Sequence, residues 1–390
     1  MTLIKEKTDP LGRSKIMLVF GTRPEAIKMA PLFHALKSQH ENFQIIVCVT
    51  AQHREMLDQV LGVFDITPDI DLNLMKPGQD LFDVTSDVLL AMRDVLRAHR
   101  PDTLLVHGDT TTSFASALAG FYSGIPVGHV EAGLRTFDVF SPFPEEFNRQ
   151  VTTKLARWHF APTVLSRQNL IREGVEESSI VVTGNTVIDA MLFILKRIDN
   201  DLALKNKLIT LLNDTLSFNW RTEKFILITG HRRENFGSGF LEICEAVKEL
   251  SIKHPKFHFI YPVHFNPNVQ APVNELLGSL DNVHLISPLN YEPFLYLLRE
   301  CYLVLTDSGG IQEEAPTLGK PVLVMREVTE RPEAVDAGTV RLVGANRESI
   351  VRNVTELLED KASYAEMSSA HSPYGDGHAC ERIINVLRGT

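Results

Sequence analysis

The sequence has few of the features that mark secreted, zinc-stapled or membrane-spanning proteins. Its 390 residues include only four cysteines and no C-x-x-C pair. Neither a disulfide framework nor a zinc ribbon is therefore expected, and reduced thiols in the cytosol are the simplest interpretation. The N-terminal segment MTLIKEKTDPLGRSK has no apolar core of a signal peptide, and no apolar run approaches the ~18 residues of a membrane span. We expect a cytoplasmic protein that does not bind membranes.

Positive charge is also in the minority. Lys and Arg number 39 against 49 Asp and Glu, which gives a net charge of -10 and argues against a nucleic-acid partner. There is no H-E-x-x-H metal motif, no G-x-S-x-G nucleophile elbow and no G-x-G-x-x-G dinucleotide fingerprint. We expect no metal and no cofactor, although a local basic pocket for a small phosphorylated molecule remains compatible with this composition.

The chain does contain a regular alternation of apolar runs and helical periods. Buried strands are predicted at IMLVF (Ile16–Phe20) and FQIIVCV (Phe43–Val49), each followed by a stretch of helical period. Continuous apolar strands between helices predict a parallel sheet that is covered on both faces. The same alternation restarts at KFILITG, after the polar helical stretch Asp199–Arg221. The sequence therefore predicts an α/β protein of two doubly wound domains, and ligands of such sheets bind at the carboxyl ends of the strands.

Three polar clusters follow predicted strands in the first half. GTRPEAIKMAP places Arg23 at a helix N-terminus and Lys28 one turn later, which is either an anion site or a solvated helix start. Asp109 follows the strand TLLVHG directly, and its alternative role is that of a helix N-cap. Glu131 follows the strand IPVGHV, and Glu145 lies at a further helix start.

Asp109 and Glu131 end successive strands, so we expect them to face the same cleft. Two neighbouring carboxylates shift each other's pKa and can divide the roles of acid and base. The alternative is simple ion pairing with Arg135 or Arg149.

Two further clusters lie in the second half. ITGHRREN follows the first strand there and contains His231, which is a candidate acid, base or phosphate contact. TDSGGIQEEAP opens a helix with residues whose backbone N–H groups can approach a phosphate, and Glu314 lies one turn further, placed for a ribose diol. The candidate phosphate contacts are Ser308, Gly309, Gly310 and Arg331. Three interpretations remain open: a nucleotide-sugar isomerase, a nucleotide-sugar glycosyltransferase, or a binding module without catalysis.

Taken together, these clusters resemble one family, the bacterial non-hydrolysing UDP-N-acetylglucosamine 2-epimerases. The matching strings, in order, are GTRPEAIKMAP, TAQHREMLDQVL, VHGDTTT, GHVEAGLR, TGNTVIDA, TGHRREN, TDSGGIQEEAP and TERPEAV. The resemblance implies the glycosyltransferase-B architecture: two Rossmann-like domains, here 1–187 and 188–377, with an interdomain cleft. It also implies that the final helix, within 378–390, packs back on the first domain.

The family interconverts UDP-N-acetylglucosamine and UDP-N-acetylmannosamine, and chemistry favours one route. The hydrogen on carbon 2 is not next to a carbonyl carbon, so its direct removal is difficult. A transient oxidation would need NAD, and the dinucleotide fingerprint is absent. The remaining route eliminates UDP to 2-acetamidoglucal and adds it back, with a proton delivered to the opposite face. The resemblance implies Asp109, Glu131 and Glu145 as the acid/base set, His231 at the phosphate, and Phe294 near the uracil.

The resemblance implies that UDP is held by Arg23, Lys28, Ser308, Gly309, Gly310, Glu314 and Arg331. It further implies a homodimer, a role in surface polysaccharide synthesis, and a second UDP-N-acetylglucosamine bound as an allosteric activator near Gln52, His53 and Arg149.

Overall fold

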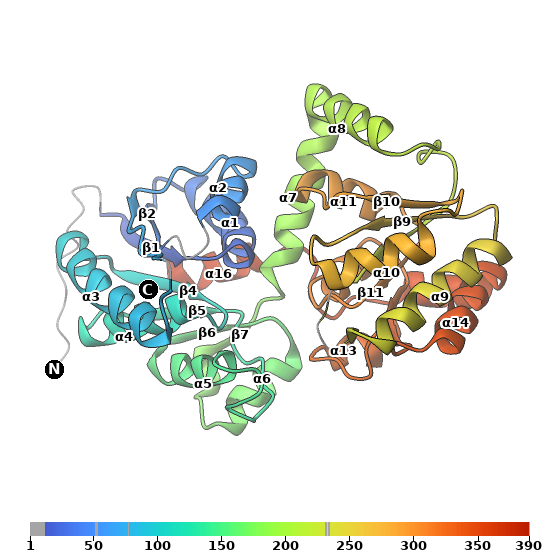
Figure 1. Cartoon of the computed structure of the whole chain (residues 1–390). Coiled ribbons are helices and arrows are strands. Elements are labelled where there is room, and N and C mark those ends of the chain that lie inside the picture. Colours follow the sequence, from blue (N-terminus) through green and yellow to red (C-terminus); the bar gives the residue numbers. More distant parts are fainter. Residues whose placement is uncertain (1–11, 51–53, 77, 231, 233–234, 390) are drawn as a thin grey trace. The chain divides into compact units, whose positions relative to one another are not determined.

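The chain folds into two compact units, each built on its own parallel sheet (Figure 1). The structure, a computed structural model, describes residues 12–50, 54–76, 78–230, 232 and 235–389. Unit 1 comprises Met1–Ala190 and Tyr374–Thr390, and unit 2 comprises Met191–Pro373. The sequence prediction set these boundaries at 187/188 and 377/378. The long helix α7 (Thr186–Asn200) passes through the first boundary, which is why no loop marks it in the sequence.

Unit 1 contains a seven-stranded parallel sheet with the order β3-β2-β1-β4-β5-β6-β7. The chain leaves β1 to one side and returns at β4 to the other, so the loops after β1 and β4 lie next to each other at the switch point of the sheet. The strands are β1 (Ser14–Phe20), β2 (Phe43–Val49), β3 (Ile70–Asp71), β4 (Thr103–His107), β5 (Val127–Val130), β6 (Trp158–Ala161) and β7 (Ile180–Val182).

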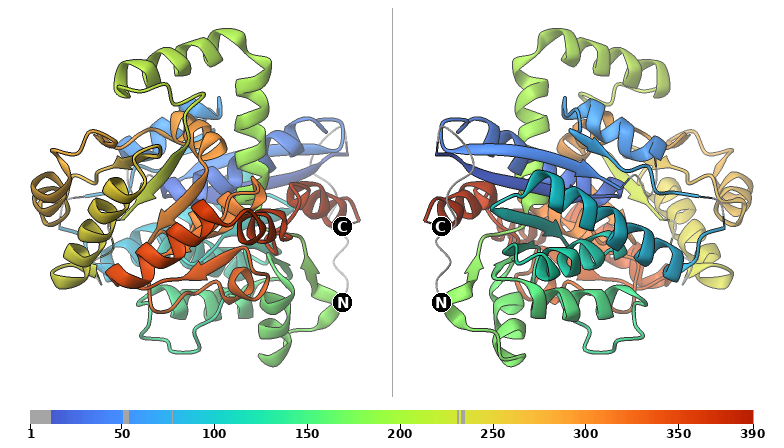
Figure 2. Two further views of the ribbon diagram at one scale, coloured as in Figure 1. Left: turned by 90° about the vertical axis from the view of Figure 1, so that its right-hand side faces the viewer. Right: turned by 90° about the vertical axis from the view of Figure 1, so that its left-hand side faces the viewer.

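Helices cover both faces of this sheet (Figure 2). In one group, α1 (Arg23–Lys37) contacts both α2 (Arg54–Val63) and the C-terminal helix α16 (Ala379–Arg388). The other group is α3 (Leu81–His99), α4 (Thr111–Tyr122) and α5 (Glu145–Leu155). The remaining elements are α6 (Val164–Arg172) and the short 3₁₀ helix η1 (Glu177–Ser179). Fully buried β-branched and aliphatic side chains of β1, β2 and β4 form the core between the layers.

The C-terminal segment is fixed to unit 1 by polar contacts as well as by packing. The carboxylate of Asp189 accepts hydrogen bonds from the backbone N–H groups of Ala379 (3.2 Å) and Cys380 (2.9 Å), at the start of α16. The Asn185 N–H donates to the Tyr374 carbonyl at 2.7 Å. These contacts satisfy helix N-terminal donors that would otherwise lack partners, so α16 is part of the unit 1 fold.

Unit 2 repeats the design with a six-stranded parallel sheet of order β10-β9-β8-β11-β12-β13. Its strands are β8 (Phe225–Thr229), β9 (His258–Pro262), β10 (Val283–Ile286), β11 (Leu303–Thr306), β12 (Val322–Val324) and β13 (Val340–Leu342). Its helices are α8 (Leu202–Thr215), α9 (Ser238–Lys253), α10 (Pro267–Leu277), α11 (Tyr291–Glu300), α12 (Ile311–Thr317), α13 (Pro332–Asp336), α14 (Arg347–Glu359) and α15 (Lys361–Ser369). The switch point here lies between β8 and β11.

The prediction of two doubly wound parallel sheets is therefore confirmed. The apolar runs predicted as strands are strands in the structure. Three short strands were not predicted: β3, β6 and β7. Among the described residues, no helix is long and apolar enough to cross a membrane.

Candidate active site

The loop after β4 places Asp109 beside an arginine. Gly108 has φ 66, a left-handed turn that favours glycine, and the helix that follows is capped by Thr110, whose hydroxyl accepts from the Ser113 N–H at 3.1 Å. The alternative role of Asp109 as the N-cap is therefore wrong. Its carboxylate instead accepts from Arg149 Nε (3.0 Å) and Nη2 (2.7 Å). One of the two predicted alternatives for Asp109, pairing with Arg149, is confirmed.

The loop after the adjacent strand β5 presents Glu131. Its carboxylate forms an ion pair with Lys28 of α1 and accepts a hydrogen bond from Asn185 Nδ2 at 2.9 Å. A Cβ built on Gly108 would lie 3.7 Å from Glu131 Oε1, so this carboxylate sits against the turn that leads to Asp109. Glu131 has φ 64, a left-handed conformation that costs a non-glycine residue roughly 1–3 kcal/mol. Local strain of this kind is typical of functional positions.

His107, the last residue of β4, is buried beside the same carboxylate. Its Nε2 lies 3.8 Å from Glu131 Oε2, and neither ring nitrogen has a hydrogen-bonding partner among the residues that the structure describes. Burial lowers its pKa to about 4, although the charges of Glu131 and Asp109 act in the opposite direction. The imidazole is therefore neutral near pH 7.

The first turn of α5 carries two adjacent glutamates with different surroundings. Glu145 is half-buried, and the hydrogen bonds and ion pairs among the described residues do not include its carboxylate. Glu146 is fully buried and accepts hydrogen bonds from the backbone of Thr136 and Phe137 and from the side chains of Arg149 and Gln150. The two neighbouring carboxylates therefore differ: Glu146 is held by several donors, and the contacts among the described residues do not hold Glu145 in this way.

Glu25 joins the loop after β1 to the loop after β4. Its buried carboxylate accepts from the backbone N–H groups of Gly21 (3.0 Å) and Thr22 (2.8 Å) and from the hydroxyls of Thr110 (2.6 Å) and Ser113 (2.9 Å). Burial raises the pKa of Glu25, and these hydrogen bonds oppose the shift. The loops that carry Arg23 and Asp109 are therefore held together by one side chain.

In unit 2, the corresponding loop after β11 contains two glycines, so other groups can approach its backbone closely. Ser308, Gly309 and Gly310 connect β11 to α12, and the Ser308 N–H donates to Thr306 Oγ1 at 2.9 Å. A Cβ on Gly309 would lie 3.2 Å from the guanidinium carbon of Arg331. Arg331 Nε donates to Glu313 Oε1 at 2.8 Å, which orients the guanidinium over this loop.

Glu314 and Phe294 lie near the same end of unit 2. Glu314 is buried, and its Oε1 accepts a hydrogen bond from the Tyr291 hydroxyl at 3.0 Å. Tyr291 begins α11, and Phe294 lies one turn later on that helix, half-buried. A fixed carboxylate acceptor near an aromatic ring is a suitable arrangement for a ribose and a base.

Three of the predicted residues, Gln52, His53 and His231, lie outside the described residues. Lys28, predicted at the diphosphate, is paired with Glu131, and Arg149, predicted at an activator site, is paired with Asp109 and Glu146. The sequence reasoning missed His107, Asn185, Glu25 and Glu146. The first two carried signals, because His107 ends a strand and Asn185 lies in the matched string TGNTVIDA.

The described residues include no group of three or more His, Cys, Asp or Glu side chains arranged to hold a metal ion. The charged and polar groups described above are carboxylates with cationic partners in unit 1 and backbone donors with an arginine in unit 2.

Comparisons with known proteins agree with this description. A family model described as UDP-N-acetylglucosamine 2-epimerase matches residues 34–388. The UDP-N-acetylglucosamine 2-epimerase of Yersinia pestis is 59% identical over 374 residues, which cover 96% of this chain and 98% of that protein.

Two solved structures bear on the fold. The Neisseria meningitidis UDP-GlcNAc 2-epimerase, bound to UDP-GlcNAc, superposes with a TM-score of 0.87 at 50% identity and covers 96% of this chain and 100% of that one. A Rickettsia africae glycosyltransferase superposes with a TM-score of 0.62 at 14% identity, covering 97% of this chain and 98% of that one. The second likeness concerns the fold alone, and it supports the predicted glycosyltransferase-B architecture.

Proposed function

The chain belongs to the UDP-N-acetylglucosamine 2-epimerase family, and we propose that it interconverts UDP-N-acetylglucosamine and UDP-N-acetylmannosamine. The observation that carries this proposal is the pair of carboxylates after the adjacent strands β4 and β5, each with its own cation. Asp109 is paired with Arg149, and Glu131 with Lys28. Inversion of a carbon needs one group to take a proton and another to deliver one, and two separately held carboxylates meet that need.

The proposed reaction begins with cleavage of the bond between the anomeric carbon and the diphosphate oxygen. UDP departs with the bonding electrons, a base removes the proton from carbon 2, and 2-acetamidoglucal forms. UDP then adds back to the anomeric carbon while a proton reaches carbon 2 on the opposite face. Asp109, Glu131 and Glu145 form the acid/base set, and His231 assists at the phosphate. The atoms balance without a cofactor.

The leaving group is held by residues of unit 2. The backbone of Ser308, Gly309 and Gly310 faces the phosphates, Arg331 adds positive charge, and Glu314 binds the ribose. This assignment is supported by the short backbone turn after β11 and by the guanidinium that lies over it. Stabilisation of departing UDP by such fixed donors contributes several kcal/mol to catalysis.

Deuterium incorporation is the decisive experiment. The protein is incubated with UDP-N-acetylglucosamine alone in deuterated water, and the sugar nucleotides are analysed by NMR. We expect deuterium at carbon 2 and a mixture of the gluco and manno isomers. A glycosyltransferase of the same fold would leave carbon 2 protonated, and a hydrolysing epimerase would accumulate free UDP. A parallel assay with a 2,3-diacetamido UDP sugar tests whether that compound is the preferred substrate.

The homodimer is also a proposal, and we assign it to the outer surface of α3 and α4. This surface exposes large apolar side chains, including Phe82 (85% exposed), Leu90 (52%) and Tyr122 (72%). Isolated domains seldom expose several such side chains together unless a partner covers them. Sedimentation velocity tests the assignment: Tyr122→Glu together with Leu90→Glu should give monomers, whereas Leu202→Glu, at an equally exposed position on α8, should not.

The biological setting is a further proposal, and it rests on the resemblance to the family. The manno product would supply surface polysaccharide synthesis, in the cytoplasm, where the four buried thiols of the chain stay reduced.

A second UDP-N-acetylglucosamine would act as an activator near Gln52, His53 and Arg149. Substrate-dependent sigmoidal kinetics, lost on replacement of His53, would support that role, and hyperbolic kinetics in the wild type would contradict it.

A further inference from the structure

Arg149 lies between two carboxylates and binds both of them. Its Nε and Nη2 donate to Asp109 Oδ2 at 3.0 and 2.7 Å, and its Nη1 donates to Glu146 Oε2 at 3.2 Å. The side chains are 12% exposed for Arg149, 28% for Asp109 and 0% for Glu146. The single positive charge of Arg149 is therefore divided between a carboxylate in the site and a carboxylate in the protein interior.

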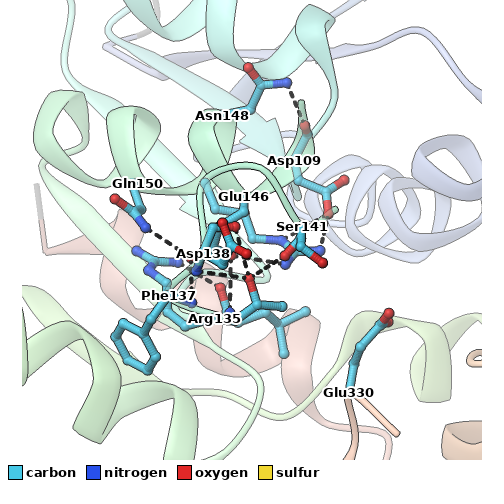
Figure 3. Close-up of polar contacts among 12 residues, drawn as sticks. Asp109, Arg135, Phe137, Asp138, Ser141, Glu146, Asn148, Gln150 and Glu330 are labelled. Carbon is cyan, nitrogen blue, oxygen red and sulfur yellow. Dashed lines mark hydrogen bonds and ion pairs between the residues drawn. The ribbon is translucent and has the colours of Figure 1, made fainter. Parts of the chain in front are cut away.

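Glu146 is held in place independently of Arg149. Its Oε2 also accepts from the Thr136 N–H at 3.2 Å, and its Oε1 accepts from the Phe137 N–H at 3.1 Å and from Gln150 Nε2 at 2.9 Å (Figure 3). A buried carboxylate with donors on both oxygens has few other positions available to it. Glu146 is thus a fixed negative charge behind Arg149, on the same helix as Glu145.

A proton-transfer group must be able to change its protonation state during turnover. A partly buried arginine with no other anionic partner would favour the ionised form of Asp109 strongly, because an opposite charge within hydrogen-bonding distance stabilises the charged carboxylate. A second negative charge on that arginine opposes the effect. We propose that Glu146 is a positioning residue that shares Arg149 with Asp109 and so limits how strongly Arg149 holds Asp109 in its ionised form.

The other charged groups at this end of the sheet do not replace Glu146 in this role. Lys28 and Glu131 form their own ion pair, and Glu145 is present unchanged in every variant considered below. Arg135 pairs with Glu173, its Nε donating to Oε1 at 2.6 Å. His107, which faces both Glu131 and Asp109, is neutral above pH 4 because burial lowers its pKa to about 4.

The test is the pH dependence of kcat for epimerisation in two variants with opposite expected shifts. Glu146→Gln removes the competing negative charge. The limb of the kcat–pH profile that depends on the protonation state of Asp109 should therefore move to lower pH. Arg149→Met removes the cation, so the same limb should move to higher pH. We expect shifts on the order of one pH unit. Opposite shifts of one limb do not follow from a loss of packing alone.

Two further variants serve as controls. Glu146→Asp shortens the side chain but keeps its charge, so the limb should return toward its wild-type position. Glu173→Gln takes a negative charge from Arg135, another buried arginine beside α5 that has no hydrogen bond to Asp109, so the limb should not move. If Arg149→Met does not fold, as judged by circular dichroism, the variants Glu146→Gln, Glu146→Asp and Glu173→Gln still test the role proposed for Glu146.

The inference rests on the proposed epimerase activity, and the assay separates the two. A wild-type protein that does not exchange deuterium at carbon 2 contradicts the proposed function. A wild-type protein that does exchange it, with both Glu146 variants leaving the limb unmoved or shifting it equally, contradicts only the inference about Glu146.

Discussion

The two units share a strand order around their switch points but differ in the side chains that follow the central strands. In unit 1, β4 and β5 are followed by Asp109 and Glu131, each bound to a cation. In unit 2, β11 is followed by the buried Asp307, which accepts a hydrogen bond from the Arg232 N–H at 2.8 Å. A serine and two glycines come next, with a guanidinium over the turn. The topology fixes where a site lies, and the loop residues fix what it does. The proposed function accordingly gives proton transfer to unit 1 and phosphate binding to unit 2.

The largest expected effect tests the role of unit 1. Asp109→Asn and Glu131→Gln should each lower kcat by about 10²–10⁴, because general acid–base catalysis typically contributes that much. Affinity for UDP, measured by isothermal titration calorimetry, should change little in either variant. An equal loss of UDP affinity would show that the two units do not divide the work as proposed.

The next effect tests unit 2. Arg331→Met should weaken UDP binding about 10- to 100-fold, since a charge-assisted hydrogen bond is worth about 1.5–3 kcal/mol. Arg341→Met is a matched control, because Arg341 also pairs with a glutamate of unit 2, Glu356, but lies away from the loop after β11. If both variants weaken UDP binding equally, the effect comes from net charge and not from Arg331.

A third prediction concerns stability in acid. His129 is buried in β5, and burial lowers its pKa to about 3. As the pH falls from 7 to 5, the unfolded chain takes up a proton on this residue and the folded chain does not, so stability falls. The effect of His129 is on the order of 2 kcal/mol at pH 5. His129→Gln should remove that share of the pH dependence of the unfolding free energy.

The measurement can be confined to unit 1. The chain has two tryptophans, with Trp158 in β6 of unit 1 and Trp220 in unit 2, so a Trp220→Phe background reports unit 1 by fluorescence. Replacing the exposed His40 by Gln in that background should leave the pH dependence unchanged. The buried carboxyls of Glu25 and Asp189, whose pKa values are raised by burial, act in the opposite direction and are common to both variants. Equal pH dependence with and without His129 would contradict the prediction.

The smallest effect is expected at an exposed ion pair. Arg347 and Glu249 pair at 2.7 Å on the surface of unit 2, with about half of the arginine side chain exposed. Solvent screens such pairs, so Arg347→Met should leave the thermal midpoint within experimental error. A clear loss of stability would mean that exposure is a poor guide to which ion pairs of this chain matter.

The sequence predicted most of the strands from apolar runs, since a strand buried on both faces largely excludes polar side chains. It did not predict β3, β6 or β7. These strands have two, four and three residues, respectively, which is too short for any of them to present a period by itself. Their hydrogen bonds to neighbouring strands define them, and these pairings are made across the sheet.

The residues of the candidate site also divide into those that the sequence predicted and those that it did not. Asp109, Glu131 and the Ser308–Gly310 turn were visible because each follows a predicted strand directly. The partners of the carboxylates were visible only in part. Arg149 was named both as an alternative ion-pair partner and at an activator site, Lys28 was expected at a phosphate, and Glu146 had no expected role. Many pairings among 88 Lys, Arg, Asp and Glu residues (39 + 49) fit the sequence equally well.

The sequence by itself determined the two layered α/β units and the ends of the strands at which reactive side chains stand, because both follow from periodicity along the chain. Only the tertiary structure decided which cation each carboxylate meets. Lys28 and Glu131 are separated by 103 positions in the chain, and Glu25 and Ser113 by 88. Contacts over such separations depend on how the strands are ordered in the sheet, and local sequence contains no record of that order.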